Sequence, residues 1–290
     1  MLVSRSTLAH LRFVFSIFLL PVYLFAYSQA GYVTPFRAIL VFVIWYVLAI
    51  PATNGYNSYF DKDEGSITLL AKPPAVDKSL YYVSILMELA AFLLGLLIGF
   101  WFALAVLVYG LMSKMYSHPS TRLKKYPVIS FLTVFFFQGA FMYWAIFGGL
   151  AGPVLLYLGW QPEILIAGGI CSCLIGASYP LTQIYQHEED SKRGDFTLSL
   201  MLGYKGSFIF SGIVFASGIV LSFFYWHILG EMKNFYVFLA CSFPIFLFFN
   251  YWFFGVIKTV SAANYKNAMC MNFISAAFML LYFGWLAYQH

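Results

Sequence analysis

The chain has 290 residues, of which 62% are hydrophobic, 21% aromatic and only 9% charged, against about 25% charged in an average soluble domain. One water-facing domain of this length cannot bury so many apolar residues, because much of its chain must stay in contact with solvent. The composition excludes a soluble globular protein and a disordered chain, and a net charge of +5 with four cysteines gives no support to nucleic-acid binding or a disulfide scaffold. All the cysteines lie in apolar segments, which predicts small buried residues: Cys171, Cys173, Cys241 and Cys270.

Apolar stretches that are long enough to cross about 30 Å of hydrocarbon recur along the chain, separated by short polar breaks. We therefore predict an all-α fold, a polytopic transmembrane bundle of nine helices that forms one integral-membrane domain over residues 1–290. The third and fourth helices share one hydrophobic run, in which we expect a turn near Gly99. The expected spans are Leu11–Tyr27, Phe36–Thr53, Leu80–Ile98, Trp101–Lys114, Val128–Phe147, Ile164–Leu181, Ser207–Tyr225, Phe235–Gly255 and Ala268–Tyr288.

The lysine and arginine residues predict the orientation of the bundle, because these residues accumulate in cytoplasmic loops. Of the 16 basic residues, all but Arg37 and Lys233 lie at the N-terminus or in the loops after even-numbered spans. We therefore expect a multi-pass membrane protein whose N-terminus and polar loops face the cytoplasm. With an odd number of spans, the C-terminal His290 lies outside.

Acidic residues gather in two of the same loops, although the positive-inside rule does not concern them. A solvated loop surface is the simplest alternative to a functional role. All but three of the 11 acidic residues lie after span two, at Asp61, Asp63, Glu64 and Asp77, or after span six, at Glu188, Glu189, Asp190 and Asp195.

The spacing within these loops favours a metal site. Asn57 and Asp61 are four residues apart, as are Gln186 and Asp190, so each pair lies on one helical face if its span continues past the membrane surface. Two such faces opposite one another present oxygen donors, which suit Mg²⁺ bound by one or two carboxylates, water and substrate phosphates. The chain has no cysteine and histidine set with zinc spacing and no phosphate-binding loop of the P-loop type.

Basic residues accompany the acidic ones and would attract an anionic substrate. The loop after span four contains Tyr116, Arg122, Lys124 and Lys125, and Lys72 follows the first acidic cluster. Carboxylate-bound Mg²⁺ flanked by lysine and arginine is an arrangement that binds and neutralises a diphosphate. The alternative is that these cations only set topology and contact anionic lipid, which we favour for Lys125 alone.

Together these residues resemble the UbiA superfamily of intramembrane prenyltransferases, and the resemblance covers the whole chain. Members have nine transmembrane helices, an N-D-x-x-D-x-x-x-D motif after helix two and a D-x-x-x-D motif after helix six. Asn57 and Asp61 match the first and third positions of the first motif, and Lys72-Pro73 is similar to the Arg-Pro that follows it. The stretch from Tyr116 to Lys124 is similar to Y-S-x-P-P-x-[KR]-x-K, and the segment from Asp190 to Gly203 resembles D-R-x-x-G-x-x-T-L-x-x-x-x-G.

The motifs depart from the family pattern at three carboxylates. Ser58 and Gly65 stand where the first motif has Asp, and Gln186 stands where the second motif begins with Asp. Nearby carboxylates could substitute only with local irregularity, since a helix rotates by about 100° per residue. The candidates for substitution are Asp63, Glu64, Glu189 and Asp195.

The resemblance implies Mg²⁺-dependent transfer of an isoprenyl group from a diphosphate to an acceptor within the membrane, the acceptor being an aromatic quinone precursor or a lipid. It implies catalytic roles for Asp61, Asp190 and Tyr116, and metal binding by Asn57, Asp61, Gln186 and Asp190. The diphosphate would bind Lys72, Arg122, Lys124 and Asn57. The expected partners are the isoprenyl diphosphate, the acceptor and the lipid bilayer, with no nucleic acid and no inferable protein partner. A UbiA-like terpene cyclase, which uses the diphosphate without an acceptor, remains an alternative.

A few polar residues lie elsewhere. Glu88 in span three is costly in hydrocarbon and is a functional candidate by default, with a structural hydrogen bond as the alternative. Asn54, Gln138 and Asn250 predict hydrogen bonds between helices. His187 predicts a solvated loop residue, with a base that acts on the acceptor as the alternative. A transporter is a further alternative, but it requires polar residues near the middle of the membrane, and here they concentrate at one face.

Overall fold

The computed structural model describes residues 4–62, 65–152 and 161–289, and over these ranges the chain is helical without a β-strand. The described residues include nine helical stretches long and apolar enough to cross a membrane. Each overlaps one of the predicted spans and confirms it, and most extend a few residues further into the polar loops. The stretches are Arg5–Gln29, Pro35–Asp61, Ser79–Ile98, Phe100–Ser117, Pro127–Ala151, Pro162–Gln183, Leu198–Ile228, Met232–Lys258 and Tyr265–Tyr288.

Three of the spans are composite helices. The first joins α1 (Arg5–Leu11), η1 (Phe13–Phe15) and α2 (Ser16–Gln29). The second joins α3 (Pro35–Phe42), η2 (Val43–Ala49) and α4 (Ile50–Asp61), and the fifth joins α7 (Pro127–Val134), η4 (Phe135–Phe141) and α8 (Met142–Ala151). The π-helical turns of η2 and η4 interrupt two of these spans, and such turns are frequent near functional sites.

The remaining spans are single helices. They are α5 (Ser79–Ile98), α6 (Phe100–Ser117), α10 (Pro162–Gln183), α12 (Leu198–Ile228), α13 (Met232–Lys258) and α14 (Tyr265–Tyr288). Gly99 separates α5 from α6 at φ 155°, a value that only glycine adopts readily, and this confirms the predicted turn. The polar loops add η3 (Leu123–Lys125), α11 (His187–Arg193) and η6 (Val260–Ala262).

The helices pack around α10, which is the most buried of the spans. It contacts α12 and η4, while α14 packs between α2 and α13, and α5 pairs with α6 beside α4. Large aromatic side chains fill the interior, and leucine, isoleucine and phenylalanine side chains cover the outer surface, as expected for a bundle in lipid. The largest fully buried side chains include Trp45, Trp226, Trp252, Tyr143 and Tyr282.

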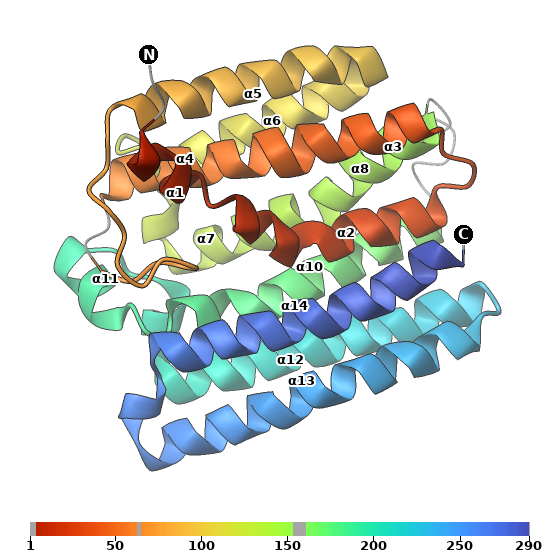
Figure 1. The fold of residues 1–290 in the computed structure, drawn as a ribbon. Coiled ribbons are helices and arrows are strands. Elements are labelled where there is room, and N and C mark those ends of the chain that lie inside the picture. The colour runs from red at the N-terminus through yellow and green to blue at the C-terminus, as the bar shows by residue number, and fades with distance from the viewer. Residues whose placement is uncertain (1–3, 63–64, 153–160, 290) are drawn as a thin grey trace.

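The polar loops share one end of the bundle. Figure 1 shows the N-terminal helix α1, the loop between α4 and α5, the loop between α6 and α7, helix α11 and the loop between α13 and α14 at that end, with the C-terminus at the other. The fold therefore brings together the segments in which the sequence concentrates its charges.

Two predictions about isolated residues need correction. Asn250 is not an interhelical contact, because its Nδ2 donates to the carbonyl of Phe246 in its own helix at 2.8 Å. Of the cysteines, Cys171 and Cys173 are buried as expected, whereas Cys241 and Cys270 are only partly buried. Both of these partly buried thiols lie on the outer helices α13 and α14.

Candidate active site

A cavity of about 340 Å³ opens among α2, α4, α10 and α14 at the polar end of the bundle. Polar side chains line its mouth, and most of the predicted site residues are among them. The predicted residues on its wall are Asn57, Asp61, Tyr116, Lys124, Gln186, Asp190 and Asp195. The structure thus brings side chains from four separate segments of the chain to one cavity.

The first motif lies on the last turns of α4, as its spacing predicts. The helix continues to Asp61, and Lys62 ends it in the left-handed conformation at φ 48°. Asn57 and Asp61 are therefore one turn apart on the same face and both line the cavity. The Lys124 ammonium forms an ion pair with the Asp61 carboxylate, and these side chains are only 12% and 7% exposed.

A hydroxyl cluster lies beside this ion pair. The Tyr116 and Tyr179 hydroxyls are 2.9 Å apart, and the Ser130 hydroxyl donates to that of Tyr116 at 3.2 Å and also contacts that of Tyr179. Both tyrosines line the cavity. Tyr179 was not predicted from the sequence, since it lies within an apolar span where a tyrosine is ordinarily a packing residue.

The second motif differs from its prediction in one respect. The helix of span six does not continue past the membrane, since α10 ends at Gln183 and a separate helix, α11, begins at His187. Gln186 precedes the first turn of α11, and its carbonyl accepts from the Asp190 amide at 2.9 Å. Both residues still line the cavity, because α11 supplies the turn that we assigned to the span. Thr197 donates to Asp190 Oδ2 at 3.3 Å.

Two glycines let the chain return from α11 to the bundle. Gly194 ends α11 at φ 72°, and Gly203 bends α12 at φ 67°, conformations that favour glycine over other residues. Between them, Asp195 accepts two hydrogen bonds from Arg122, at 2.9 and 2.8 Å. Arg122 is not among the side chains that line the cavity, so it contributes through Asp195.

Glu189 lies at the place of a carboxylate that the first motif lacks. Its Oε1 accepts from the Gly65 amide at 3.3 Å, and its Oε2 would be only 2.2 Å from a Cβ atom at that position. The space that a side chain at residue 65 would occupy therefore contains a carboxylate from the second motif. Two further candidates, Asp63 and Glu64, lie outside the described residues.

Lys72 does not reach the site. It is exposed in the loop between α4 and α5 and is not on the cavity wall. Nearness in sequence to the first motif indicated a shared site, but the loop directs this residue elsewhere. The direct diphosphate contact predicted for Lys72 is not supported by its position.

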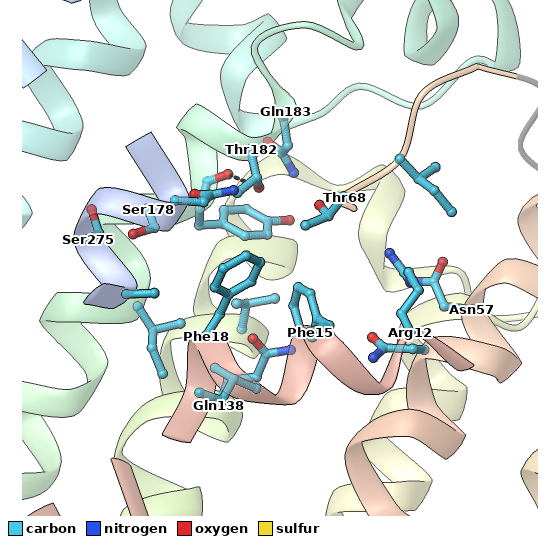
Figure 2. Close-up of a pocket in the computed structure, with 18 of the residues that line it drawn as sticks. Arg12, Phe15, Phe18, Asn57, Thr68, Gln138, Ser178, Thr182, Gln183 and Ser275 are labelled. Carbon is cyan, nitrogen blue, oxygen red and sulfur yellow. Dashed lines mark hydrogen bonds between the residues drawn. The ribbon is translucent and has the colours of Figure 1, made fainter. Parts of the chain in front are cut away.

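The cavity also contains residues that the sequence analysis did not assign to it. Arg12 adopts the left-handed conformation at φ 46° where α1 ends, and lines the cavity wall. Figure 2 shows Arg12 and Asn57 on one side of Phe15 and Phe18, with Ser178 and Ser275 on the other. Arg12 was counted only as a topology residue, and no motif distinguished it from the other cations.

Two amides predicted to join helices also face this cavity. Gln138 lines it, as Figure 2 shows. Asn54 lines it one turn deeper than Asn57. Its side chain is 8% exposed, and its Nδ2 has no hydrogen-bond partner within the part of the chain that the structure describes. This nitrogen does not make the predicted interhelical hydrogen bond among the described residues, and it is a buried donor in a side chain that lines the cavity.

The deeper part of the cavity is mainly apolar, although Gln138 and Ser275 also line it. Its wall includes Leu19, Val22, Leu174, Ile175, Met279 and Phe283. Along α10 the lining residues run from Gln183 to Cys171, which at about 1.5 Å per residue is a depth of roughly 18 Å. The cavity therefore joins a charged mouth to an apolar channel that extends into the membrane-spanning part of the bundle.

His187 is not the solvated loop residue that we predicted. Its Nε2 lies 2.7 Å from the Ser199 hydroxyl, and its ring stacks on Tyr204 with centroids 4.5 Å apart. Burial lowers the pKa of this imidazole below 6.5. His187 thus attaches α11 to the first turns of α12.

The donor set suits Mg²⁺ but does not form a complete metal cage. Among the described residues, no three histidine, cysteine, aspartate or glutamate side chains could by themselves hold an ion. The cavity instead offers three carboxylates, Asp61, Asp190 and Asp195, of which the last is held by Arg122, with the side-chain amides of Asn57 and Gln186. Mg²⁺ commonly binds one or two carboxylates and completes its octahedron with water and substrate phosphates, so these residues fit the ion in the presence of a diphosphate.

Comparison with known proteins agrees with this geometry. The family model for the UbiA prenyltransferase family matches residues 17–275. The chain belongs to this family. The match extends from α2 into α14 and includes both motifs and the cationic loop. A search of curated proteins found no match.

Several solved structures have the same fold. A UbiA homologue from Archaeoglobus fulgidus bound to DMAPP and Mg²⁺ is 17% identical, with a TM-score of 0.67 over 98% of this chain and 99% of that chain. A structure reported for digeranylgeranylglyceryl phosphate synthase is 19% identical, with a TM-score of 0.63 over 99% of both chains. The apo UbiA homologue from Aeropyrum pernix K1 is 16% identical, with a TM-score of 0.66 over 93% of this chain and 98% of that chain.

Proposed function

We propose that this UbiA family member catalyses Mg²⁺-dependent transfer of an isoprenyl group from an isoprenyl diphosphate to a membrane-soluble acceptor. The observation that carries the proposal is the single cavity in which carboxylates of both motifs and the Lys124 cation meet an apolar channel. The Archaeoglobus fulgidus homologue has been solved with DMAPP and Mg²⁺ and also with GPP and Mg²⁺. The same class of donor and the same ion suit the residues of this cavity.

The charged mouth would bind the diphosphate. Asp61 and Asp190, with the amide oxygens of Asn57 and Gln186, would hold Mg²⁺, which neutralises the charge that develops on a departing diphosphate. Lys124 and Arg12 supply cationic donors for the remaining phosphate oxygens. Lys124 pairs with Asp61, so it would exchange one anionic partner for another on binding the diphosphate. Arg122 keeps Asp195 in place through two hydrogen bonds.

The apolar channel would hold the isoprenyl chain and exclude water. When the allylic C–O bond breaks, its electron pair leaves with the diphosphate and positive charge develops on the allylic carbon. The faces of Phe15 and Phe18 lie on the cavity wall, and aromatic faces stabilise a nearby cation. The acceptor then donates an electron pair to that carbon and loses a proton. Tyr116, within its cluster of hydroxyls, is placed to orient the reacting groups.

We also propose that the polar end of the bundle faces the cytoplasm. The N-terminal segment, the loops and the adjoining helix turns at that end contain all the basic residues except Arg37 and Lys233, and such residues accumulate on the cytoplasmic side. Labelling of single cysteines placed in the loop after α6 and in the loop after α12, in intact cells, would test this. Reagent that cannot cross the membrane should label only the second position.

The decisive test is release of pyrophosphate by purified protein from dimethylallyl, geranyl, farnesyl and geranylgeranyl diphosphates, with aromatic and lipid acceptors. We expect release with Mg²⁺ and none with EDTA, and loss of release in Asp61→Ala and in Asp190→Ala. Glu188→Ala is the matched control, because Glu188 is exposed and pairs only with Lys192 in the described contacts. Mass spectrometry of products separates acceptor transfer from cyclisation. No release from any donor and acceptor would contradict the proposal.

A further inference from the structure

A second cavity, of about 280 Å³, lies among α4, α5 and α6. Helix α4 separates it from the first cavity, since Thr53 lines the second and Asn54 and Asn57 line the first. The wall is almost entirely apolar, apart from the side chains of Thr53, Glu88, Tyr109 and Lys114. None of the residues assigned to the diphosphate site contributes to it.

The second cavity contains an ion pair at membrane depth. The Lys114 ammonium pairs with the Glu88 carboxylate, and these side chains are 26% and 13% exposed. Glu88 lies nine residues into α5, which is about 13 Å from the helix start. The carboxylate packs against Gly110, where a Cβ atom would be in ordinary van der Waals contact at 3.4 Å from the Glu88 carboxyl carbon.

The direction of Lys114 is unusual for its position. It lies in the last turn of α6, where a lysine in lipid ordinarily extends its ammonium toward the headgroups. Here the side chain pairs with Glu88 instead, and its Nζ lies 5.4 Å from the centre of the Tyr56 ring. The charge of Glu88 is thereby neutralised inside the bundle.

One oxygen of the Glu88 carboxylate lies outside this ion pair. Glu88 Oε1 is buried and has no hydrogen-bond partner among the residues that the structure describes. A carboxylate oxygen can only accept hydrogen bonds, and leaving a buried charged acceptor unsatisfied is costly. This oxygen therefore requires a hydrogen-bond donor. Glu88 lines the cavity, but Oε1 itself is covered, so the carboxylate must turn toward the cavity for a donor there to reach it.

The cavity is open toward lipid. Three of its lining side chains are half-exposed on the outer surface of α5 and α6, namely Leu89 at 51%, Leu107 at 40% and Leu111 at 50%. A ligand would enter from the bilayer and place an apolar body against these leucines. Because Lys114 already balances the charge of Glu88, a neutral donor suits the site better than a second cation, and an anion would be repelled by the carboxylate.

We propose that this cavity binds a neutral lipid alcohol, whose hydroxyl donates to Glu88 Oε1 and whose hydrocarbon chain lies between α5 and α6. The ligand class comprises uncharged amphiphiles with one hydroxyl headgroup, such as long-chain or isoprenoid alcohols. The site is separate from the diphosphate cavity and does not depend on the proposed reaction.

The test uses the full chain in lipid nanodiscs and a hexadecanol probe that contains a diazirine. After irradiation, peptide mass spectrometry should place the label on α5 and α6. Unlabelled hexadecanol should compete, whereas hexadecyl methyl ether, which lacks the donor, should compete about tenfold less well, as expected for a hydrogen bond to a charged group. Both competition arms use the wild-type protein, so they do not depend on the folding of a variant.

A double variant tests the polar pair directly. Glu88→Leu with Lys114→Met removes both charges, so that neither is left unpaired, and should lower labelling of α5 and α6 about tenfold. Glu188→Ala with Lys192→Ala is the matched control, since it removes an exposed ion pair, and should leave labelling unchanged. Equal competition by the ether, labelling spread evenly over all lipid-facing helices, or equal labelling of the double variant would each overturn the proposal.

Discussion

The two cavities on either side of α4 differ in how their charged side chains are paired. In the active-site cavity, charges from distant segments pair with each other, as Asp61 does with Lys124. In the second cavity, Glu88 pairs with Lys114 among apolar side chains, and one carboxylate oxygen has no donor from the residues that the structure describes. The first arrangement suits a charged ligand that exchanges partners with the protein. The second suits a neutral ligand that completes one hydrogen bond.

The contrast also explains why the first cavity is at the polar end of the bundle. Moving an ion out of water costs on the order of several kcal/mol. A site for a highly charged diphosphate is therefore feasible where the bundle meets water. A neutral alcohol requires no such access. The position of a cavity along the membrane normal thus indicates the charge of its ligand.

The largest expected effect comes from the cation that pairs with Asp61. Lys124→Met removes a donor from the proposed diphosphate site and leaves the carboxylate without this partner, so we expect kcat/KM to fall by about 10²–10³-fold, as for loss of one donor to a developing charge. Lys125→Met is the matched control, because Lys125 lies over the Tyr126 ring and not on the cavity wall. Pyrophosphate release measures both. Equal losses in the two variants would show that only the overall charge of the loop matters.

The next largest expected effect is a loss of stability when Asp195, which follows α11, loses its pairing with Arg122. Asp195→Asn keeps the shape of the side chain but weakens its two hydrogen bonds to Arg122, and the carboxylate is 6% exposed. We expect the protein to lose about 3 kcal/mol of stability, near the lower end for breaking a buried pair, because Arg122 is partly exposed. The midpoint of thermal unfolding in detergent measures this. Lys192→Ala, which breaks the exposed pair with Glu188, should leave the midpoint unchanged.

The membrane spans could be predicted because the lipid interior imposes one strong requirement, a run of apolar residues about as long as the hydrocarbon is thick. The pairing of Asn57 with Asp61 could be predicted for a similar reason, since α4 stays helical through both residues. The prediction that span six continues as one helix through Gln186 and Asp190 was wrong, because α10 ends at Gln183. The short helix α11 restores the spacing by a route that no periodicity indicated.

The residues that were missed share a physical cause. Arg12 lies between α1 and η1 and Asn54 lies on α4, and the packing of the bundle decides which side of these segments faces the cavity. A segment that is apolar all round gives no signal of which face is inside. Asn54 was read as an interhelical contact for that reason. Lys72 was included because it follows the first motif, but closeness along a loop does not fix closeness in space. Glu189 partly replaces the carboxylate that is missing at Gly65. This is also a tertiary contact, which closeness along the chain does not fix.

A smaller effect should follow from replacing Asn54. Asn54→Leu removes the buried donor Nδ2 while keeping the volume, and we expect about a tenfold fall in kcat/KM for the acceptor, the loss of one well-placed hydrogen bond. Binding of the isoprenyl diphosphate should change less, because Asn54 lies one turn below the motif. Asn250→Leu is the control, since that amide bonds its own helix at the surface. A fall confined to diphosphate binding would contradict this assignment.

The smallest expected effect is a pH dependence of stability that arises from His187. Burial lowers the pKa of its imidazole below 6.5, so the folded protein keeps this side chain neutral at a pH where the unfolded chain takes up a proton. Stability is therefore fully present above pH 6.5, is lost as the pH falls below it, and levels off once the folded side chain is protonated too. We expect hydrogen exchange in α11, measured relative to the intrinsic rate of an unprotected amide at each pH, to rise between pH 7.5 and 5.5, and less so in His187→Gln. Because α11 contains Asp190, activity should fall over the same range, and unchanged protection of the α11 amides in the wild type would show that the contact with Ser199 does not hold the helix.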